Sequence, residues 1–286
     1  MKNSTKNTRK NDLKQTRNVI ARQTLPRRAL GAPPLPTKGT NLYQTNDDIA
    51  NDYDHLTPPN YPIAYKARKW FFCGLQLFID ESVLVPRFET EELVNVIASI
   101  AKQSHYAGVR RTTDPHILDL CTGSGCIAVA LAVSLRAKAK QSRPQITASD
   151  ISADALKVAR KNARAHKVKI KFIQSDLFNN SSFCNLQSAF DVIVCNPPYI
   201  KTAEIGKFDK SILHEPALAL DGGADGLEFY RRIIADAPKY IAPGGLLFFE
   251  VGDKAQALDV KTLLQTAGFC DITITGNHIV HCKTAL

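Results

Sequence analysis

From residue 116 to the end of the chain, short apolar stretches alternate with segments of helical periodicity. The first apolar stretch, 116–120, is typical of a buried strand, and 126–136 follows it as a helix. Strands separated by helices pair in parallel and need helical cover on both faces. The alternation therefore predicts an α/β fold, with a mostly parallel sheet of seven strands, helices on both faces and a C-terminal antiparallel hairpin. The remaining strands are expected at 145–149, 169–174, 190–195, 245–251, 271–275 and 278–282, and the remaining helices at 153–166, 227–241 and 254–267.

The first 115 residues lack this alternation and divide into two parts. Residues 1–60 are rich in Lys, Arg, Asn, Thr and Pro, a composition that predicts a largely disordered segment with little packed structure. After residue 60 we expect a β-hairpin that turns at Gly74 and a linker helix after Pro86, with Thr90 as its N-cap. The predicted parts are the basic, Pro-containing segment 1–60, the hairpin and linker helix of 61–115, and the main domain, 116–286.

The net charge of the chain, +10, is concentrated near its beginning. Residues 1–40 hold ten Lys or Arg and a single acid, Asp12, and so carry +9 of that charge. A basic segment of this kind binds polyanions without reading their sequence, so nonspecific contact with RNA or the ribosome is one interpretation. The alternatives are a solvated arm and an organelle transit peptide, which would place the protein in the mitochondrial matrix.

Cysteine usage and the longest apolar run bear on where the chain works. The seven cysteines form no C-x-x-C pair, which favours buried thiols in a reducing compartment, and we expect a cytoplasmic protein. The longest apolar run, 127–135, is about half as long as a membrane-spanning helix, so no membrane partner is expected. His278, His281 and Cys282 alternate with apolar residues as in a terminal strand, and we predict no metal site.

The strand at 116–120 ends in the sequence Asp-Leu-Cys-Thr-Gly-Ser-Gly, which leads into the next helix. Gly123 and Gly125 let a ligand approach the backbone closely, and the exposed amides lie at a helix N-terminus. Positions 127–129 are Ile-Ala-Val, so the third glycine of the dinucleotide fingerprint is absent. A nicotinamide cofactor is therefore disfavoured.

Two acids follow the next two strands. Asp150 ends its strand 25 residues after Gly125, where a carboxylate accepts hydrogen bonds from both hydroxyls of a ribose. Asp176 follows the third strand, at a position where a carboxylate accepts from an adenine amino group. The alternatives are an acid near a helix N-cap for Asp150 and a plain turn acid for Asp176. Together the two acids favour an adenosine cofactor.

Asn196-Pro197-Pro198-Tyr199 directly follows the strand at 190–195 and faces the same edge of the sheet. Proline fixes φ and lacks an N–H, so the Asn196 side-chain oxygen and the Pro197 carbonyl can serve as two rigid acceptors. Two acceptors hold both hydrogens of one –NH₂ group and so orient its nitrogen toward a methyl donor. Tyr199 adds an aromatic wall for a planar group or a sulfonium. The motif therefore predicts methyl transfer to such a group, with a plain proline turn as the alternative.

With these motifs in view, the chain over about residues 61–286 resembles the class I S-adenosylmethionine methyltransferases, and within them the protein-(glutamine-N5) methyltransferases of the HemK type. The resemblance implies the class I, Rossmann-like fold and S-adenosyl-L-methionine as cofactor. It also implies methylation of the glutamine in the Gly-Gly-Gln loop of class 1 peptide chain release factors, which would be the protein partners. The segments that carry the resemblance are 85–92, 119–125, Asp150, Asp176, 196–199, 214–216 and 222–226.

The resemblance further implies roles for individual residues. The implied catalytic residues are Asn196, Pro197 and Tyr199. The implied cofactor-binding residues are Thr122, Gly123, Ser124, Gly125, Asp150, Asp176, Leu177 and Asn196. The implied substrate-binding residues are Asn196, Pro197, Pro198, Tyr199, Arg87 and Glu89.

Three other functions stay open on the sequence alone. A sister group resembling this family methylates a glutamine of a large-subunit ribosomal protein, and the residues at 70–74 are similar to that group. Amino-methylation of adenine or cytosine in nucleic acid uses the same two acceptors, but the candidate target-recognition insertions, 102–115 and 200–214, are short. A ribosome-binding module without activity is the non-enzymatic alternative, and the intact Asn196 and Asp150 argue against it.

Overall fold

The structure of the protein is a computed structural model that describes residues 45–53, 60–102, 115–138, 144–184 and 189–284. The disorder predicted for residues 1–44 and 54–59, and the RNA contact predicted for 1–40, lie outside these residues. Among the described residues, no helix is long and apolar enough to cross a membrane.

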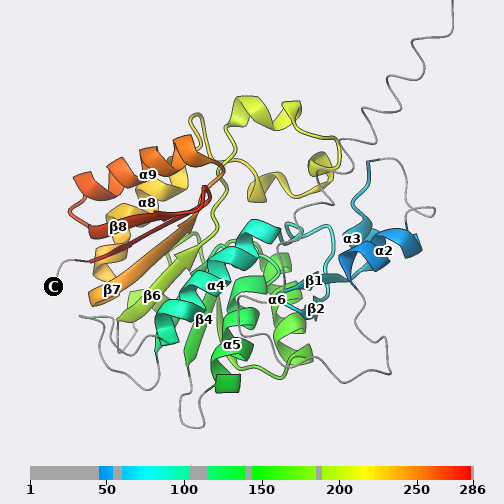
Figure 1. Ribbon diagram of the computed structural model, residues 1–286, viewed down its shortest axis with the longest axis horizontal. Helices are drawn as coiled ribbons and strands as arrows, with labels where there is room; N and C mark the ends of the chain where they lie inside the picture. Colours follow the sequence, from blue (N-terminus) through cyan, green and yellow to red (C-terminus); the bar gives the residue numbers. More distant parts are fainter. Residues whose placement is uncertain (1–44, 54–59, 103–114, 139–143, 185–188, 285–286) are drawn as a thin grey trace, which may run out of the picture. The chain divides into compact units, whose positions relative to one another are not determined.

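The main sheet is built from seven strands, which are β3 (His116–Leu120), β4 (Gln145–Asp150), β5 (Ile170–Gln174), β6 (Phe190–Cys195), β7 (Ile241–Glu250), β8 (Cys270–Thr275) and β9 (Ile279–Lys283). Their order in the sheet is β5-β4-β3-β6-β7-β9-β8 (Figure 1). The first five strands in this order pair in parallel, whereas β9 pairs antiparallel with both β7 and β8. The predicted mostly parallel sheet and its C-terminal hairpin are therefore confirmed.

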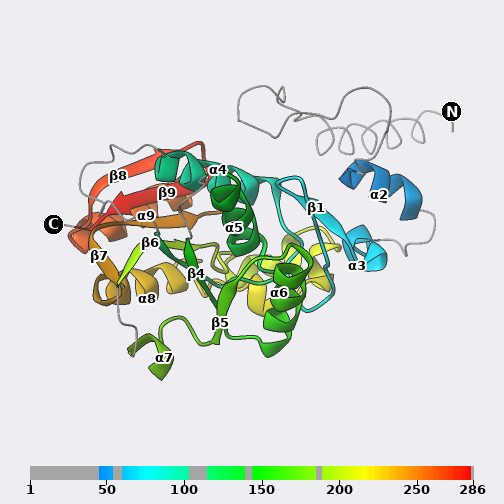
Figure 2. The same ribbon diagram turned by 90° about the horizontal axis from the view of Figure 1, so that it is seen from below.

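Helices cover both faces of this sheet (Figures 1 and 2). One face packs against α4 (Phe88–Lys102), α5 (Cys126–Lys138) and α6 (Ala153–Ala165), and the other against α8 (Glu228–Asp236) and α9 (Lys254–Thr266). Successive side chains of a strand point to opposite faces. Val192 and Val194 of β6 accordingly join the core beneath the first group of helices, and Ile193 and Cys195 join the core beneath the second. β6 is buried along its whole length, which explains its nearly continuous apolar sequence.

The hairpin predicted around Gly74 is confirmed. β1 (Trp70–Phe72) pairs antiparallel with β2 (Leu75–Leu77), and the short helix α3 (Ile63–Ala67) precedes them. Gly74 takes a φ of 73°, in the left-handed region that a tight turn of this kind requires.

The expectation of little packed structure within 1–60 is wrong for residues 46–53, because Asn46–Tyr53 forms the helix α2. Ile49 on this helix is fully buried. The Asn46 side chain bonds twice to the hairpin: its Oδ1 accepts from the Phe71 N–H at 2.8 Å, and its Nδ2 donates to the Phe71 carbonyl at 2.9 Å. These tertiary contacts stabilise a helix that the composition of the segment does not indicate.

The predicted N-cap of α4 is also wrong. The helix begins at Phe88, so Thr90 lies within its first turn, and the Thr90 side chain is 1% exposed. The Thr90 hydroxyl instead accepts a hydrogen bond from the Asn196 side chain, 106 residues away in the sequence. By contrast, α6 has a regular cap, because the Ser152 Oγ accepts from the Ala155 N–H at 3.1 Å.

The helix predicted at 227–241 is shorter, and the strand after it is longer. α8 is followed by a 3₁₀ turn, η5 (Ala237–Lys239), and β7 begins at Ile241 instead of Gly245. Gly244 and Gly245 lie inside β7, next to an irregularity in its pairing with β6. Glycine inside a strand commonly marks such a bulge or a close backbone approach.

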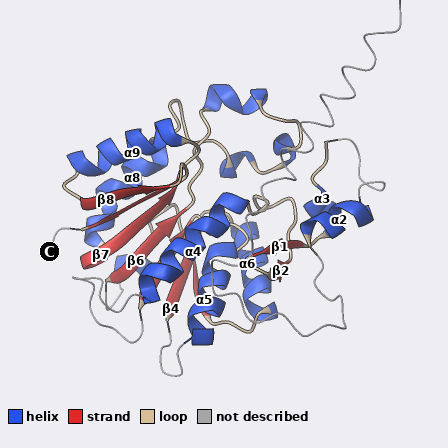
Figure 3. Ribbon diagram, viewed as in Figure 1, coloured by secondary structure: helices blue, strands red, loops and turns tan. Residues whose placement is uncertain are grey.

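The order of the strands reverses at the centre of the sheet. β4 and β5 lie on one side of β3, whereas β6 and β7 lie on the other. Figure 3 shows β4 on one side of β6 and β7 on its other side. In open α/β sheets, ligands bind outside the carboxyl ends of the strands at such a switch point. The topology therefore brings the segments after β3, β4 and β6 to one place, although they are far apart in the sequence.

The segment after β6 is a long excursion, 200–222, that returns to its starting point. It contains the 3₁₀ turns η2 (Thr202–Lys207), η3 (Ile212–His214) and η4 (Ala217–Ala219). At its base, the Gly222 N–H donates to the Ile200 carbonyl at 2.8 Å. A Cβ on Gly222 would lie 2.6 Å from the Cα of Tyr199 and 2.9 Å from the Pro198 carbonyl oxygen. This contact therefore requires glycine and fixes the backbone of the Asn-Pro-Pro-Tyr motif.

Gly222→Ala should displace the backbone at Pro198 and Tyr199, because the atoms that the new methyl group meets are main-chain atoms. We expect the free energy of unfolding to fall by about 1–3 kcal/mol, the usual cost of overpacking, as measured by denaturant unfolding. Gly206→Ala is the matched control, since it lies in the same excursion and a Cβ there would meet no heavy atom within 4 Å. Equal stability of the two variants would contradict this account of Gly222.

Candidate active site

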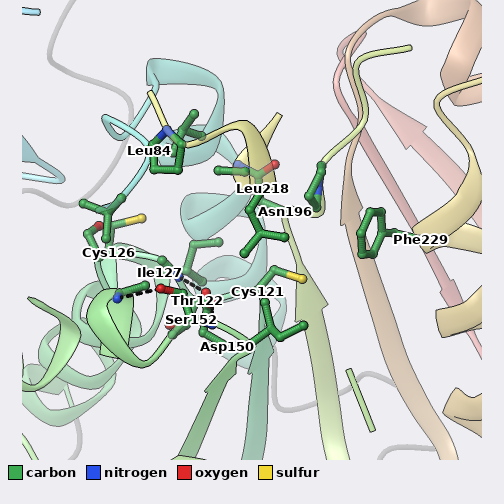
Figure 4. Close-up of a pocket in the computed structure, with 18 of the residues that line it drawn as sticks. Leu84, Cys121, Thr122, Cys126, Ile127, Asp150, Ser152, Asn196, Leu218 and Phe229 are labelled. Atoms are coloured by element: carbon green, nitrogen blue, oxygen red, sulfur yellow. Dashed lines mark hydrogen bonds between the residues drawn. The ribbon is translucent and has the colours of Figure 1, made fainter. Parts of the chain in front are cut away.

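A cavity of about 330 Å³ lies at the carboxyl ends of β3, β4 and β6 (Figure 4). In this view Leu84 and Leu218 lie above the cavity, Asp150 lies below it and Phe229 lies to one side. Eight residues predicted from the sequence line its wall: Thr122, Gly123, Ser124, Asp150, Asp176, Leu177, Asn196 and Pro198. Five other predicted residues, all of them described, stand outside the wall: Gly125, Pro197, Tyr199, Arg87 and Glu89. The roles of all these residues stay predictions.

The two glycines after β3 differ in what they contact. Gly123 takes a φ of +52°, and a Cβ there would meet no heavy atom within 4 Å, so the backbone is open to a ligand. Its N–H donates to the Asp150 Oδ2 at 2.8 Å. Gly125 takes a φ of +77°, and a Cβ there would lie 3.0 Å from the Cβ of Ala159 on α6. Gly125 therefore lets α6 pack closely against the loop and does not face the cavity.

Asp119 of β3 supports the glycine loop from beneath. The Asp119 Oδ2 accepts from the Thr122 hydroxyl at 2.6 Å and from the Ala128 N–H at 3.2 Å, and the residue is fully buried. Burial raises the pKa of the Asp119 carboxyl to about 7; the nearby Asp150 adds to this rise, and the two hydrogen bonds oppose it. The group that holds the loop therefore changes its protonation near neutral pH.

Asp150 ends β4 with both carboxylate oxygens bound by the backbone. Besides the bond from Gly123, the Asp150 Oδ1 accepts from the Ser152 N–H at 2.9 Å. The cap of α6 is Ser152, so Asp150 does not serve as the capping acid. Burial raises the pKa of Asp150, and its backbone hydrogen bonds oppose that rise. A ligand hydroxyl at this wall would meet a carboxylate whose orientation is already fixed.

Asp176 and Arg232 form an ion pair at another part of the wall. The Arg232 Nη2 lies 2.6 Å from the Asp176 Oδ2, and each side chain is 38% exposed. The Arg232 guanidinium also lies over the ring of Phe229, 5.6 Å from its centroid, and both residues line the cavity. Arg232 is not among the site residues predicted from the sequence. The pair and the ring offer a flat, charged and aromatic surface of the kind that binds planar rings.

The Asn-Pro-Pro-Tyr motif is held from behind by residues of other elements. The Asn196 Nδ2 donates to the Thr90 Oγ1 at 3.3 Å, so the residue expected to cap α4 contacts the motif instead. The Tyr199 carbonyl accepts from the Gln256 Nε2 at 3.0 Å. The Tyr199 ring packs on Gly252, where a Cβ would lie 3.1 Å from its Cδ2. The ring therefore contacts the loop after β7.

Arg87 pairs with Glu215 across two distant segments. The Arg87 Nη2 lies 2.6 Å from the Glu215 Oε1, and the Glu215 side chain is only 3% exposed. Burial raises the pKa of Glu215, and the Arg87 charge opposes that rise. Removing one member of a buried pair leaves the other charge uncompensated. The pair therefore ties the segment before α4 to the excursion after β6.

Glu250, the last residue of β7, is a site residue that the sequence analysis missed. It is 1% exposed, and its carboxylate accepts hydrogen bonds from the side chains of Thr90 and Asn196. Burial raises the pKa of Glu250 to about 7. A signal was available, because Glu250 follows a buried apolar strand in the same way as Asp150 does.

The donors and acceptors of the cavity fit an adenosyl ligand. The Ser175 Oγ is buried in the cavity wall and has no hydrogen-bond partner among the described residues. With the open backbone at Gly123 and the fixed carboxylate of Asp150, it provides polar contacts for a ligand with hydroxyl and amino groups.

No group of three or more His, Cys, Asp or Glu in the described part of the chain could hold a metal ion. His281 and Cys282 lie in β9, so the interpretation of this segment as a terminal strand is confirmed. The His281 ring stacks on Phe248 with a centroid distance of 5.1 Å, which is a packing contact in the core.

Comparison with known proteins agrees with this geometry. The family model described as Methyltransferase small domain matches residues 108–223. The release factor glutamine methyltransferase of Chlorobaculum tepidum is 39% identical over 216 residues, which span 74% of this chain and 69% of that protein. The corresponding protein of Thermodesulfovibrio yellowstonii is 36% identical over 239 residues, 80% of this chain and 79% of that protein. The solved hMettl16 catalytic domain in complex with MAT2A 3′UTR hairpin 6 is similar in fold alone, with a TM-score of 0.55 and 16% identity, covering 74% of this chain and 76% of that one.

The strand order, with a cavity at its switch point, is that of the class I, Rossmann-like methyltransferase fold, and the methyltransferases at 36–39% identity place the chain in this class. The chain is therefore an enzyme of methyl transfer. Given the identity and coverage of its relatives, it belongs to the family of the release factor glutamine methyltransferases.

Asp119→Asn tests the buried carboxyl beneath the glycine loop. Its pKa is about 7 in the folded state and about 4 in an unfolded chain. The folded state therefore binds the proton more tightly, and the free energy of unfolding falls as the pH rises from about 4 to about 7. Between about pH 5 and about pH 8, the free energy of unfolding of the variant should fall by about 2–3 kcal/mol less than that of the wild type, as measured by denaturant unfolding.

Asp259→Asn, on the exposed face of α9, is the control for this measurement and should keep the full fall. If Asp119→Asn also kept it, the Asp119 carboxyl would not ionise in the folded state near neutral pH.

Proposed function

We propose that the protein transfers a methyl group from S-adenosyl-L-methionine to the side-chain amide nitrogen of a glutamine, in the Gly-Gly-Gln loop of a class 1 peptide chain release factor. The names of the relatives support this substrate. The observation that carries the proposal is that Asn196 lines the same cavity as Asp150, while its Nδ2 is bonded to Thr90. This leaves the Asn196 oxygen as the acceptor for a substrate amide.

The residues proposed to hold the cofactor lie around the cavity. Thr122, Gly123 and Ser124 would bind its methionine end, Asp150 would accept from its ribose hydroxyls, and Asp176 with Leu177 would contact its adenine. When bound, S-adenosylmethionine supplies an electrophilic methyl group on a sulfonium. Gly125 supports this arrangement indirectly by letting α6 pack against the loop.

The chain's own part in the reaction is alignment. An amide nitrogen is a weak nucleophile because its lone pair is delocalised into the carbonyl, so its placement against the methyl group matters more than binding alone. The Asn196 Oδ1 and the Pro197 carbonyl would each accept one hydrogen of the substrate amide. Asn196 does not take up a proton, since a side-chain amide does not titrate near neutral pH. Tyr199, Pro198, Arg87 and Glu89 are proposed to contact the substrate around this point.

Location and further partners belong to the same proposal. We expect the protein to work in the cytoplasm, with the mitochondrial matrix as the alternative. Residues 1–40 are proposed to add nonspecific contact with RNA or the ribosome through their +9 charge.

Labelled S-adenosylmethionine and a panel of substrates test the proposed function directly. The panel holds a release factor, its variant with Gln→Ala in the Gly-Gly-Gln loop, the large-subunit ribosomal protein and duplex DNA. We expect label on the first substrate alone. Label on the ribosomal protein or on DNA would identify one of the alternative substrates and overturn the release factor.

Asp150→Ala should weaken the binding of S-adenosylmethionine by about 1–3 kcal/mol, because the ribose hydroxyls lose a charged acceptor. Calorimetric titration of the free enzyme measures this change. Asp154→Ala is the control, since its exposed side chain pairs with Lys157 on the surface of α6. Unchanged affinity in Asp150→Ala would remove Asp150 from the cofactor site.

Asn196→Ala should lower kcat by roughly 10²–10³-fold, as the loss of one preorganised polar group at a reacting centre does. The affinity for the cofactor should change little, because Asn196 is proposed to act on the substrate amide. Steady-state kinetics with a release factor as substrate separates the two effects. A rise in KM with unchanged kcat would make Asn196 a simple binding contact and overturn its alignment role.

A further inference from the structure

Glu250 and Asn196 meet at the back of the cavity wall, on the carboxyl ends of the neighbouring strands β7 and β6. Glu250 is almost completely buried, with 1% of its surface exposed, and it does not line the cavity. Its carboxylate accepts hydrogen bonds from the Asn196 and Thr90 side chains. The Asn196 Nδ2 also donates to the Thr90 Oγ1, at 3.3 Å. The three side chains thus contact one another, whereas the second Glu250 oxygen, Oε2, is buried without a hydrogen-bond partner among the described residues.

The chemistry of this group decides which way the Asn196 amide faces. An ionised carboxylate only accepts hydrogen bonds, so it binds the amide through its nitrogen. Thr90 accepts from the same nitrogen and gives its own hydroxyl hydrogen to Glu250. Both hydrogens of the Asn196 Nδ2 therefore have acceptors behind the wall, and its Oδ1 is the atom left to face the cavity.

We propose that Glu250 is a positioning residue for methyl transfer, which through Asn196 presents an amide oxygen to the substrate and keeps the amide nitrogen away from it. This inference rests on the proposed function and extends it to a residue that touches neither substrate nor cofactor. A flipped Asn196 would present two N–H donors to the substrate –NH₂ group. An amide –NH₂ group only donates hydrogen bonds, so donors would face donors and no hydrogen bond would form. Glu250 excludes that arrangement.

The orientation depends on the charge of Glu250. With a pKa raised to about 7 by burial, the carboxyl is ionised above this pH and protonated below it. A protonated carboxyl offers an O–H donor, so it no longer requires the amide nitrogen to face it. Activity should therefore fall on the acid side of about pH 7. The titratable and charged groups around Glu250 are Glu89, which raises its pKa, Arg87, which lowers it, and the weakly acidic Tyr199, Tyr230 and Cys126.

Glu250→Gln is the first test, with kcat measured against pH on a release factor substrate at saturating cofactor. The wild type should show an acid limb near pH 7, because Glu250 becomes protonated there. Neither the glutamine amide nor Asn196 titrates in this range. In Glu250→Gln we expect kcat at about pH 8 to fall by roughly 10- to 100-fold, the scale of a misplaced reacting group, and the acid limb to disappear. Affinity for S-adenosylmethionine by calorimetry should be unchanged, which also shows that the variant is folded.

Glu91→Gln is the matched control. Glu91 lies on α4 beside Thr90, burial raises its pKa, and its Oε1 accepts from the Cys73 N–H at 2.7 Å, away from the motif. This variant should keep the wild-type kcat and the acid limb.

Exchange of the two side chains is the sharper test. Asn196→Asp alone would place a second carboxyl beside the buried Glu250, and the two groups would compete for one proton. Combined with Glu250→Gln, the same change restores one amide and one carboxylate in contact, with a carboxylate oxygen left to face the cavity. We expect the double variant to recover at least about tenfold in kcat over Asn196→Asp. A role for Glu250 in packing alone, without contact to residue 196, predicts no such rescue.

The outcomes separate this inference from the proposed function. A wild type that labels no glutamine substrate would overturn the proposed function and the role of Glu250 with it. An active wild type whose acid limb persists in Glu250→Gln would assign the limb to another group, such as Asp119, and overturn the role of Glu250 alone. A double variant whose kcat does not exceed that of Asn196→Asp would likewise overturn the role of Glu250 alone.

Discussion

The five parallel strands of this sheet are covered by helices on both faces, and that constraint decides where polar chemistry can lie. A charged side chain in the middle of such a strand would lose its water without gaining a partner. At the carboxyl ends the next segment turns away and leaves backbone N–H groups that a carboxylate can accept from. Asp150 has two such donors, and Glu250 has two side-chain donors instead. The switch between β3 and β6 then opens a cavity beside these strand ends.

Burying several carboxyl groups away from water costs free energy, and their hydrogen bonds offset this cost only in part. Asp119, Asp150 and Glu250 all have a pKa raised by burial, and for Asp119 and Glu250 the value comes to about 7. Each of these ionised groups therefore destabilises the fold near neutral pH relative to its protonated form. Functional sites commonly keep polar arrangements that a core optimised for stability would lack. In this protein, the buried carboxyl groups that lower the stability also orient the glycine loop and the Asn196 amide.

Rigidity at the Asn-Pro-Pro-Tyr motif comes from parts of the chain on either side of it in sequence. Thr90, on α4, contacts Asn196 from 106 residues earlier, and Gln256, on α9, holds the Tyr199 carbonyl from 57 residues later. Gly222 closes the excursion directly onto the motif backbone. Since reacting groups must be held within fractions of an ångström, support from several elements is more effective than the motif's own prolines alone.

The sequence by itself determined the elements and the strand-end residues, because both depend on local pattern. The apolar run of β6 and the alternation after residue 116 indicate the parallel sheet. The same strand assignments place Asp150 and Asn196 at the ends of buried strands. Pairings between distant segments were left to the tertiary structure. The bond of Thr90 to Asn196, the ion pair of Asp176 with Arg232 and the helix α2 all depend on which strands and helices become neighbours. Periodicity fixes which face of an element is apolar, whereas the partner of a polar side chain is chosen only when the chain has folded and the strand order is set.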